Sequence, residues 1–346
     1  MRAMRVVYAE QHKLHATDNV QRSGFPFLTE EVPARAEIIL SAIQVAGVGP
    51  VIAPTDHGLD PILAVHDTGF VEFLRGAYDA EGAPVFVESF ATRAIRRKPK
   101  GSAGLKGYYA FGDDSPLLEG TWTAAYWSAQ CALTAADLIR DGERSAYALC
   151  RPPGHHAAAD LYGGACYLNS AAIAARYLQP HLASSPRGRG DRGGAAILDI
   201  DYHHGNGTQE IFYTDPAVLY CSLHVDPDSE YPFYWGGADE RGEGAGEGFN
   251  RNWPLPNGTG DAAYLAALDE ALSVIRDFDP HTLVVSAGFD IVWGDPWGGF
   301  DITRDGLREI GRRIAALDVP TVIVQEGGYH REMLGESAVA FLQAFP

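Results

Sequence analysis

Short apolar runs alternate with longer amphipathic stretches along most of the chain. Several of the short runs are apolar at nearly every position, which is typical of strands that are covered on both faces. The alternation of such runs with helical spacing predicts a parallel α/β sheet. The predicted strands are Arg5–Ala9, Ser145–Cys150, Ala195–Asp201, Val218–Leu223, Thr282–Ser286 and Thr321–Gln325, and the predicted helices are Pro33–Ala46, Pro61–Ala77, Thr121–Asp141, Asn169–Leu178, Asp261–Phe278, Thr303–Leu317 and Arg331–Phe345.

Two segments interrupt this alternation. Residues 82–120 are rich in Gly, Pro and charge, and a loop of that length is usually functional or used in an interaction. A disordered insertion is the alternative. Residues 184–194 are low in complexity and predict a flexible surface connection. Because neither segment clearly divides the chain, we expect a single domain over residues 1–346.

The composition disfavours several classes of protein and of partner. The chain has 346 residues, enough for a large core, and its 27 basic and 45 acidic residues give a net charge of −18. That charge disfavours nucleic acid or an anionic membrane as the main partner and favours a cationic one, although solubility explains the acidity equally well. Four cysteines are too few for a disulfide scaffold and are expected to be buried and reduced. With no signal peptide or membrane-spanning run, we expect a soluble cytoplasmic protein.

Polar side chains gather where the predicted strand Ala195–Asp201 ends. Residues two apart on a strand share a face, so Asp199, Asp201 and His203 are expected to point together, away from their apolar neighbours. Two carboxylates and an imidazole on one face are costly unless something pairs with them. A divalent cation suits both ligand types and is the simplest partner. A hydrogen-bonded polar network is the alternative.

A further carboxylate follows the predicted strand Thr282–Ser286, at Asp290 in the run Ala-Gly-Phe-Asp. Together with Asp201 and His203 it would make three protein ligands, which leaves coordination positions for water and substrate, as in catalytic metal sites. Two nearby acids compete for this role. Their loop, Trp-Gly-Asp-Pro-Trp-Gly-Gly, predicts a solvent-facing turn for both, Asp295 and Asp301.

Two more strand ends carry candidate catalytic groups. The predicted strand Ser145–Cys150 leads to the adjacent histidines His155 and His156, and Thr321–Gln325 leads through two glycines to Tyr329. In open α/β sheets, ligands bind outside the carboxyl ends of the strands. All four polar clusters are therefore expected at one edge of the sheet, where they predict a metal-dependent active site.

This set of groups is suited to amide hydrolysis. A metal with an open position polarises a carbonyl group and lowers the pKa of bound water. A histidine can take the proton of that water and return it to the leaving amine, and a tyrosine hydroxyl can stabilise the oxyanion. No nucleophilic Ser or Cys is needed. The sequence also lacks Gly-x-Ser-x-Gly, which argues against a serine hydrolase of the α/β-hydrolase kind.

Five motifs, in this order, resemble those of the histone deacetylase superfamily: R-P-P-G-H-H-A, D-x-D-x-H-H-G-N-G-T, S-L-H, A-G-F-D and E-G-G-Y. Within it, the chain looks most like the bacterial acetylpolyamine amidohydrolases, because of M-R-V-V-Y-A-E-Q-H-K-L near the start, the insertion ending in G-T-W, and D-P-D-S-E-Y-P-F. The resemblance implies a three-layer, mostly parallel α/β sheet of the arginase and deacetylase type. It also implies a homodimer in which residues 82–120 pack between subunits and narrow the entrance.

The resemblance implies a zinc site and sites for monovalent cations. The superfamily's zinc ligands fall on Asp201, His203 and Asp290. These donor atoms are harder than thiolates, so Fe²⁺ or Co²⁺ could substitute. The residues implied for a structural potassium site are Asp199, Asp201, His203, Ser222 and Leu223. A second cation site would involve Phe212, Asp215, Val218 and Phe249.

The same motifs imply roles for the catalytic groups. The superfamily pairs the first histidine, His155, with the carboxylate of Asp199, and uses the second, His156, as general base and acid. Tyr329 takes the place of the tyrosine that stabilises the transition state. The partner of His156 is Asn206, where many relatives have Asp. A neutral partner stabilises charged His156 less well, so its pKa is expected to be lower than an Asp would give.

The substrate tunnel departs from the superfamily pattern at one wall. After Gly164, relatives usually carry an aromatic residue, whereas this chain has Ala165, and Tyr231 is expected to form the opposite wall. The tunnel is therefore expected to be wider. The insertion carries three acids, Asp113, Asp114 and Glu119. They could contact a distal ammonium group of the substrate or form a solvated acidic turn.

We therefore expect a zinc-dependent amidohydrolase that removes acetyl groups from small cationic acetylated amines, above all acetylpolyamines. Deacetylation of acetyl-lysine or of other small acylated amines is the first alternative. An arginase-like ureohydrolase would need ligands for two adjacent metals. A metal-stabilised protein that binds acetylated amines without turnover would have no use for a proton shuttle.

Overall fold

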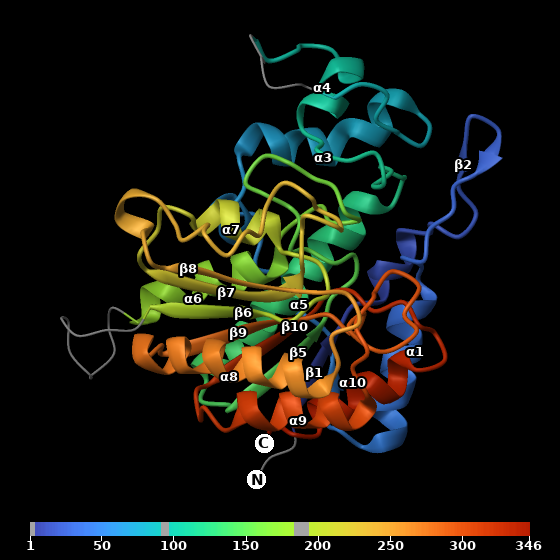
Figure 1. Ribbon diagram of the computed structural model, residues 1–346. Coiled ribbons are helices and arrows are strands. Elements are labelled where there is room, and N and C mark those ends of the chain that lie inside the picture. The colour runs from blue at the N-terminus through green and yellow to red at the C-terminus, as the bar shows by residue number, and fades with distance from the viewer. Residues whose placement is uncertain (1–3, 91–96, 183–193) are drawn as a thin grey trace.

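The computed structural model describes residues 4–90, 97–182 and 194–346. Its centre is an eight-stranded sheet in the order β4-β1-β5-β10-β9-β6-β7-β8, in which every neighbouring pair is parallel. A small hairpin, β2–β3, projects from this body (Figure 1). The strands are β1 (Arg5–Tyr8), β2 (Gln21–Arg22), β3 (Phe25–Pro26), β4 (Val51–Ile52), β5 (Ser145–Leu149), β6 (Ala195–Asp199), β7 (Val218–Val225), β8 (Asn250–Leu255), β9 (Thr282–Ala287) and β10 (Thr321–Gln325).

Helices cover both faces of the sheet (Figure 1). Successive strand residues alternate between two apolar clusters: Val7 belongs to the cluster that includes residues of α3, α5 and α6, whereas Val6 belongs to the one that includes residues of α1, α8, α9 and α10. This arrangement confirms the predicted three-layer α/β fold. The helices are α1 (Ala34–Ala46), α2 (Asp60–Leu63), α3 (Thr68–Glu81), α4 (Ser102–Tyr108), α5 (Thr121–Arg140), α6 (Ser170–Leu182), α7 (Asn206–Phe212), α8 (Asp261–Phe278), α9 (Arg304–Ala315) and α10 (Leu334–Leu342).

Two strands of the sheet, β4 and β8, were not predicted, and both lie at its edges. The sequence of β8, Asn-Arg-Asn-Trp-Pro-Leu, is polar and contains Pro254. Edge strands tolerate both features because one side of the backbone is not needed for pairing. The predicted strand Ala195–Asp201 is also shorter than expected, since β6 ends at Asp199. Asp201 and His203 therefore lie in the loop beyond the strand.

The predicted helix Pro61–Ala77 is instead two helices, α2 and α3. The helical conformation is interrupted near the buried His66. The ring of His66 contacts the carbonyl of Ala158 (2.9 Å) and accepts from the backbone N–H of Asn169 (2.9 Å). Asp67 then caps α3 by accepting from Phe70 N. Apolar spacing continues across the break, so the sequence pattern did not reveal it.

The insertion at residues 82–120 is not simply a loop, because it contains helix α4, which lies against α3 (Figure 1). Its use in a dimer stays a prediction. Residues 91–96, and all but Gly194 of the predicted surface connection at 184–194, lie outside the described residues. The four cysteines are buried and form no disulfide, as expected. In the described parts of the chain, no helix is long and apolar enough to cross a membrane.

Candidate active site

The structure brings Asp201, His203 and Asp290 together at the carboxyl ends of β6 and β9. One ligand atom from each lies within 4.8 Å of the others. His203 Nδ1 lies 3.3 Å from Asp201 Oδ1 and 3.4 Å from Asp290 Oδ2. Asp290 Oδ1 accepts from the backbone N–H of Tyr202 (3.0 Å), whereas its buried Oδ2 accepts no hydrogen bond from any described residue. This oxygen faces the other two ligands, and its described contact there is the ion pair with His203.

The electrostatics of the triad fit a cation. Burial and the neighbouring Asp201 carboxylate raise the pKa of Asp290 to about 7. Burial alone would lower the pKa of His203, but the hydrogen bond with Asp201 and the charges of Asp290 and Asp201 raise it to about 9. Two buried carboxylates that repel each other beside an imidazole form a donor set that a divalent metal ion satisfies. The residues present therefore fit the zinc that the resemblance implies.

Gly327 lets the backbone after β10 approach the triad closely. Its N–H donates to Asp201 Oδ2 (2.8 Å). A Cβ atom at this position would lie 2.2 Å from Asp290 Oδ2 and 2.6 Å from Asp201 Oδ2. Any side chain here would collide with both carboxylates, so glycine is required at this position.

The two histidines lie side by side, with ring centroids 4.0 Å apart. His155 Nδ1 is 3.1 Å from Asp199 Oδ2, and His156 Nδ1 is 2.7 Å from Asn206 Oδ1. The pairs therefore form as the motifs implied. Burial opposes the charged form of both rings. The charges of Asp201 and Asp199 overcome it and raise the pKa of His155 to about 10.

The pKa of His156 moves in the opposite direction. Burial, followed by the charges of His155 and His203, lowers it well below its usual value. His156 is therefore neutral beside a charged neighbour. Pairs of titratable groups whose pKa values are pushed apart are typical of acid–base sites.

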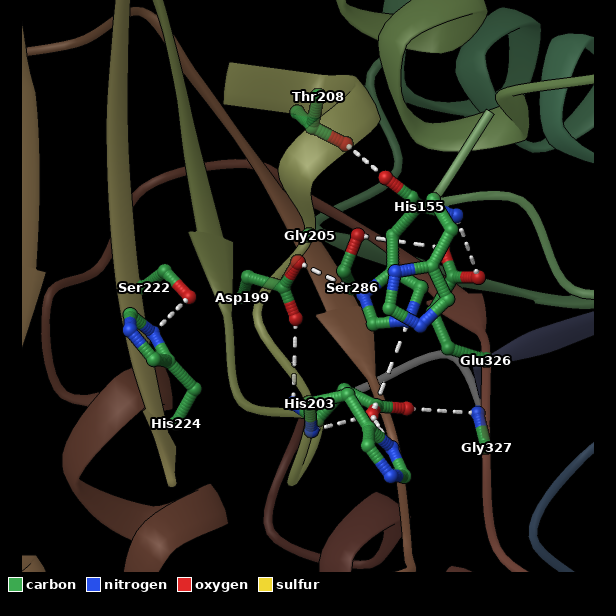
Figure 2. Close-up of polar contacts among 12 residues, drawn as sticks. His155, Asp199, His203, Gly205, Thr208, Ser222, His224, Ser286, Glu326 and Gly327 are labelled. Carbon is green, nitrogen blue, oxygen red and sulfur yellow. Dashed lines mark hydrogen bonds and ion pairs between the residues drawn. The ribbon is translucent and has the colours of Figure 1, made fainter. Parts of the chain in front are cut away.

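Asp199 lies at the end of β6, directly opposite Ser222 of β7 in the sheet register. Figure 2 shows Asp199 between His155 on one side and Ser222 with His224 on the other. Its Oδ1 accepts from Asp201 N (3.1 Å), and its Oδ2 accepts from the hydroxyl of Tyr220 (3.1 Å). The residues of the expected potassium site are thus neighbours, and the site itself stays a prediction.

Glu326, for which the sequence pattern indicated no role, is fully buried. Its Oε2 accepts from the backbone N–H groups of Gly154 (2.6 Å) and His155 (3.2 Å), and its Oε1 accepts from the hydroxyl of Ser286 (Figure 2). Burial raises its pKa to about 7. The carboxylate therefore holds the start of the histidine loop, and its position directly after an apolar strand was the available signal.

Tyr329 is packed between two side chains from distant parts of the sequence. The guanidinium of Arg35 lies 4.4 Å from the centroid of its ring, and the centroid of Trp297 lies 4.3 Å away. Arg35 Nε also donates to the carbonyl of Gly328 (2.6 Å). Burial raises the pKa of Tyr329, so its hydroxyl keeps its proton. Nothing in the sequence pattern pointed to the buried Arg35.

The expectation of a solvent-facing turn is wrong for Asp295 and right for Asp301, which is exposed. Asp295 is only 5% exposed. Its Oδ2 accepts from the backbone N–H groups of Tyr329 (2.7 Å) and His330 (2.9 Å). A run rich in Gly, Pro and Trp does not reveal that a later loop covers it.

A cavity of about 510 Å³ opens above these groups. At Gly164 a Cβ atom would lie 2.4 Å from the ring of His156 and 2.8 Å from the hydroxyl of Tyr231, so a side chain would block it. The three residues predicted for the tunnel all line this cavity. Its full lining is Asp114, His156, Gly164, Ala165, Tyr202, His203, Glu230, Tyr231, Asn257, Pro296, Trp297, Gly298, Gly299 and Tyr329.

Of the three acids proposed from the insertion, Asp114 lines the cavity, where its Oδ1 accepts from Gly164 N (2.9 Å). Asp113 instead pairs with Arg22 (2.9 Å), and Glu119 is not among the lining residues. Sequence analysis missed a second acid of the lining, Glu230, although its motif D-P-D-S-E-Y-P-F was noted. Its Oε1 accepts from Asn257 Nδ2 (3.3 Å).

The chain is similar to known proteins over almost its whole length. The model of the histone deacetylase domain family matches residues 29–345. Acetylpolyamine amidohydrolase 1 of Pseudomonas aeruginosa is 45% identical over 98% of each chain, and acetylpolyamine amidohydrolase of Burkholderia pseudomallei is 44% identical over 99% of this chain and 98% of its own. The crystal structure of acetylpolyamine aminohydrolase from B. pseudomallei superposes with a TM-score of 0.90 at 42% identity, covering 99% of this chain and 98% of that one.

The chain belongs to the histone deacetylase domain family. It is a hydrolytic deacetylase, as expected from its motifs. The arginase-like ureohydrolase and the binding protein without turnover are therefore set aside.

Proposed function

We propose that this chain removes the acetyl group from acetylpolyamines. The observation that carries the proposal is one cavity that is lined both by His156, His203 and Tyr329 and by two carboxylates, Asp114 and Glu230. No lysine or arginine is among the described residues that line it. Such a cavity favours a cationic amide substrate. The names of the relatives from P. aeruginosa and B. pseudomallei support the same substrate class.

Asp201, His203 and Asp290 would hold the catalytic metal, which we propose to be zinc, with Fe²⁺ or Co²⁺ as substitutes. When bound, a divalent ion supplies Lewis acidity to the amide carbonyl and lowers the pKa of water. The chain's own contribution is to keep the three ligand atoms close together and to bury two of the three ligands, Asp201 and Asp290.

His156 acts as general base and then as general acid. An amide oxygen can only accept, so the contact with Asn206 Oδ1 places a proton on His156 Nδ1 and leaves Nε2 as an acceptor. Nε2 takes the proton of the attacking water and later gives it to the leaving amine. Burial, followed by the charges of His155 and His203, lowers the pKa of His156 and keeps it neutral at the start of the reaction.

Tyr329 supplies a hydrogen bond to the carbonyl oxygen as that oxygen gains negative charge. Because burial raises the pKa of Tyr329, the phenol remains a donor at neutral pH. A donor that is already fixed by packing needs no reorganisation during the reaction. Arg35 and Trp297 provide that packing, since both lie against the ring of Tyr329.

The distal end of the substrate meets the acidic part of the cavity. Asp114 uses Oδ1 for Gly164 N, and Glu230 uses Oε1 for Asn257, so each carboxylate has a second oxygen for an ammonium group. Ala165 in the tunnel wall leaves room for the chain between the amide and that ammonium. We also propose that potassium binds at Asp199 and that residues 82–120 form a homodimer interface.

The test is a substrate panel on the purified zinc-loaded protein. We expect kcat/KM for acetylputrescine and acetylspermidine to exceed that for a neutral N-alkylacetamide of equal length by about tenfold or more, the equivalent of ~1.4 kcal/mol. A neutral compound of the same length is the matched control for each acetylpolyamine, since it lacks only the charged amino groups. Acetyl-lysyl peptides are the second arm, and a higher kcat/KM for them would replace the polyamine proposal by a lysine deacetylase.

The partner of His156 gives a prediction about pH. In Asn206→Asp a carboxylate replaces the amide, stabilises the charged form of His156 and raises its pKa. A base must be unprotonated to act, so the acid limb of the kcat/KM profile is expected to move to higher pH. Profiles of both proteins at equal zinc content measure the shift. An acid limb that stays in place, or moves to lower pH, would contradict the role of His156.

A further inference from the structure

The buried carboxylate of Asp295 joins two loops of the active site. Its Oδ2 accepts from Tyr329 N (2.7 Å) and His330 N (2.9 Å), and its Oδ1 accepts from Trp297 N (2.9 Å). Asp295 itself does not line the cavity. It therefore touches no substrate, but it holds the backbone of the tyrosine and of the tryptophan that packs against the tyrosine ring.

The three contacts require a carboxylate. Both oxygens accept, and all three partners are backbone N–H groups. An asparagine of the same shape offers one acceptor and one NH₂ group. Whichever way its amide turns, the NH₂ faces at least one backbone N–H, which is left without an acceptor. Leaving a buried donor unpaired is costly, so one of the two loops has to move.

The loop of Asp295 is also the loop of the metal ligand Asp290. Gly298 lies against the backbone of Asp290, where a Cβ atom would be 1.8 Å from its carbonyl oxygen. The distance between the tyrosine hydroxyl and the triad thus depends on how these two loops are tied. Asp295 ties them through Tyr329 N and His330 N, beside the backbone bond from Phe289 N to the carbonyl of Gly327 (3.1 Å).

We propose that Asp295 is a positioning residue for the reaction, which fixes the phenol of Tyr329 relative to the metal ligands through the backbone of residues 329 and 330. The proposal rests on the role proposed above for Tyr329, and it does not depend on which acetylated amine is the substrate.

The test is a double-mutant cycle with Asp295→Asn and Tyr329→Phe. If Asp295 acts through the phenol, Asp295→Asn lowers kcat roughly thirtyfold when Tyr329 is present. This loss is smaller than the ~10²–10³-fold loss expected when one donor to a developing oxyanion is removed altogether. In the Tyr329→Phe background it then lowers kcat by less than about threefold. Asp301→Asn, an exposed acid of the same loop, is the matched control and leaves kcat unchanged. Equal losses in both backgrounds, or no loss in either, would overturn the proposal.

Amide hydrogen exchange gives a second readout that needs no turnover. In Asp295→Asn we expect faster exchange at the amides of Tyr329 and His330 than in Asp301→Asn, with zinc content unchanged. If Asp295→Asn does not fold, Asp295→Glu retains the charge but displaces the carboxylate, and the same cycle applies. Unchanged exchange at both amides would contradict the proposal. Failure of the wild type to deacetylate acetylpolyamines would instead count against the proposed substrate.

Discussion

Asp290→Asn is expected to lower kcat/KM by about a thousandfold or more and to release the metal. The amide is a weaker ligand than the carboxylate, and a Lewis acid contributes several kcal/mol of transition-state stabilisation, where about 4 kcal/mol corresponds to roughly a thousandfold. Asparagine can keep the hydrogen bond from Tyr202 N to Oδ1, so the local backbone is retained. Steady-state kinetics and metal analysis of the purified variant measure both effects.

The stability of the metal-free proteins separates loss of the site from misfolding. Burial and Asp201 raise the pKa of Asp290 to about 7 in the folded state, above its value of roughly 4 in an unfolded chain. The free energy of unfolding of the metal-free wild type therefore falls as pH rises from about 4 to 7. In Asp290→Asn this contribution to the pH dependence is absent, because the amide does not titrate. At pH 8 the metal-free variant is expected to melt at or above the temperature of the metal-free wild type. A much lower melting temperature would mean that Asp290 supports the fold rather than a metal.

Tyr329→Phe is expected to lower kcat by ~10²–10³-fold, because it removes one donor to the developing oxyanion. The phenyl ring keeps its packing against Arg35 and Trp297, so KM should stay within about twofold. Zinc content should be unchanged, since the hydroxyl is not among the metal ligands.

The matched control is Tyr126→Phe, which removes a phenol from α5 that bonds to Asp56 outside the cavity. It is expected to keep wild-type kcat. A Tyr329→Phe variant that raises KM but retains kcat would assign the hydroxyl to substrate binding and remove it from the chemistry.

The main groups of the site could be predicted because parallel strands share one edge for their carboxyl ends. Asp201, His203 and Asp290 follow two strands that lie next to each other in the sheet, β6 and β9. Each of these strands is apolar enough to be predicted from its own sequence. The polar residues that follow each strand indicate the edge of the sheet at which the site lies. The parallel central sheet was predictable for the same reason, with the exception of its short or polar edge strands.

The parts that could not be predicted depend on contacts across long stretches of sequence. Asp295 and Tyr329 are 34 residues apart in the sequence. Only in the folded chain does the backbone N–H of Tyr329 donate to the carboxylate of Asp295. Arg35 lies in α1 and reaches the carbonyl of Gly328 from the far end of the chain. Local sequence patterns predict which side chains are exposed and which elements form. They do not identify a buried charged side chain whose hydrogen-bond partners come from another loop.

Metal titration of the protein with defined metal content is the most direct test of a single divalent ion on Asp201, His203 and Asp290. A chelator should abolish turnover, and one equivalent of zinc per chain should restore it in the wild type. In Asp290→Asn one equivalent should neither bind with wild-type affinity nor restore activity. Turnover that survives complete removal of metal, or wild-type zinc affinity in the variant, would contradict the assignment of these three residues.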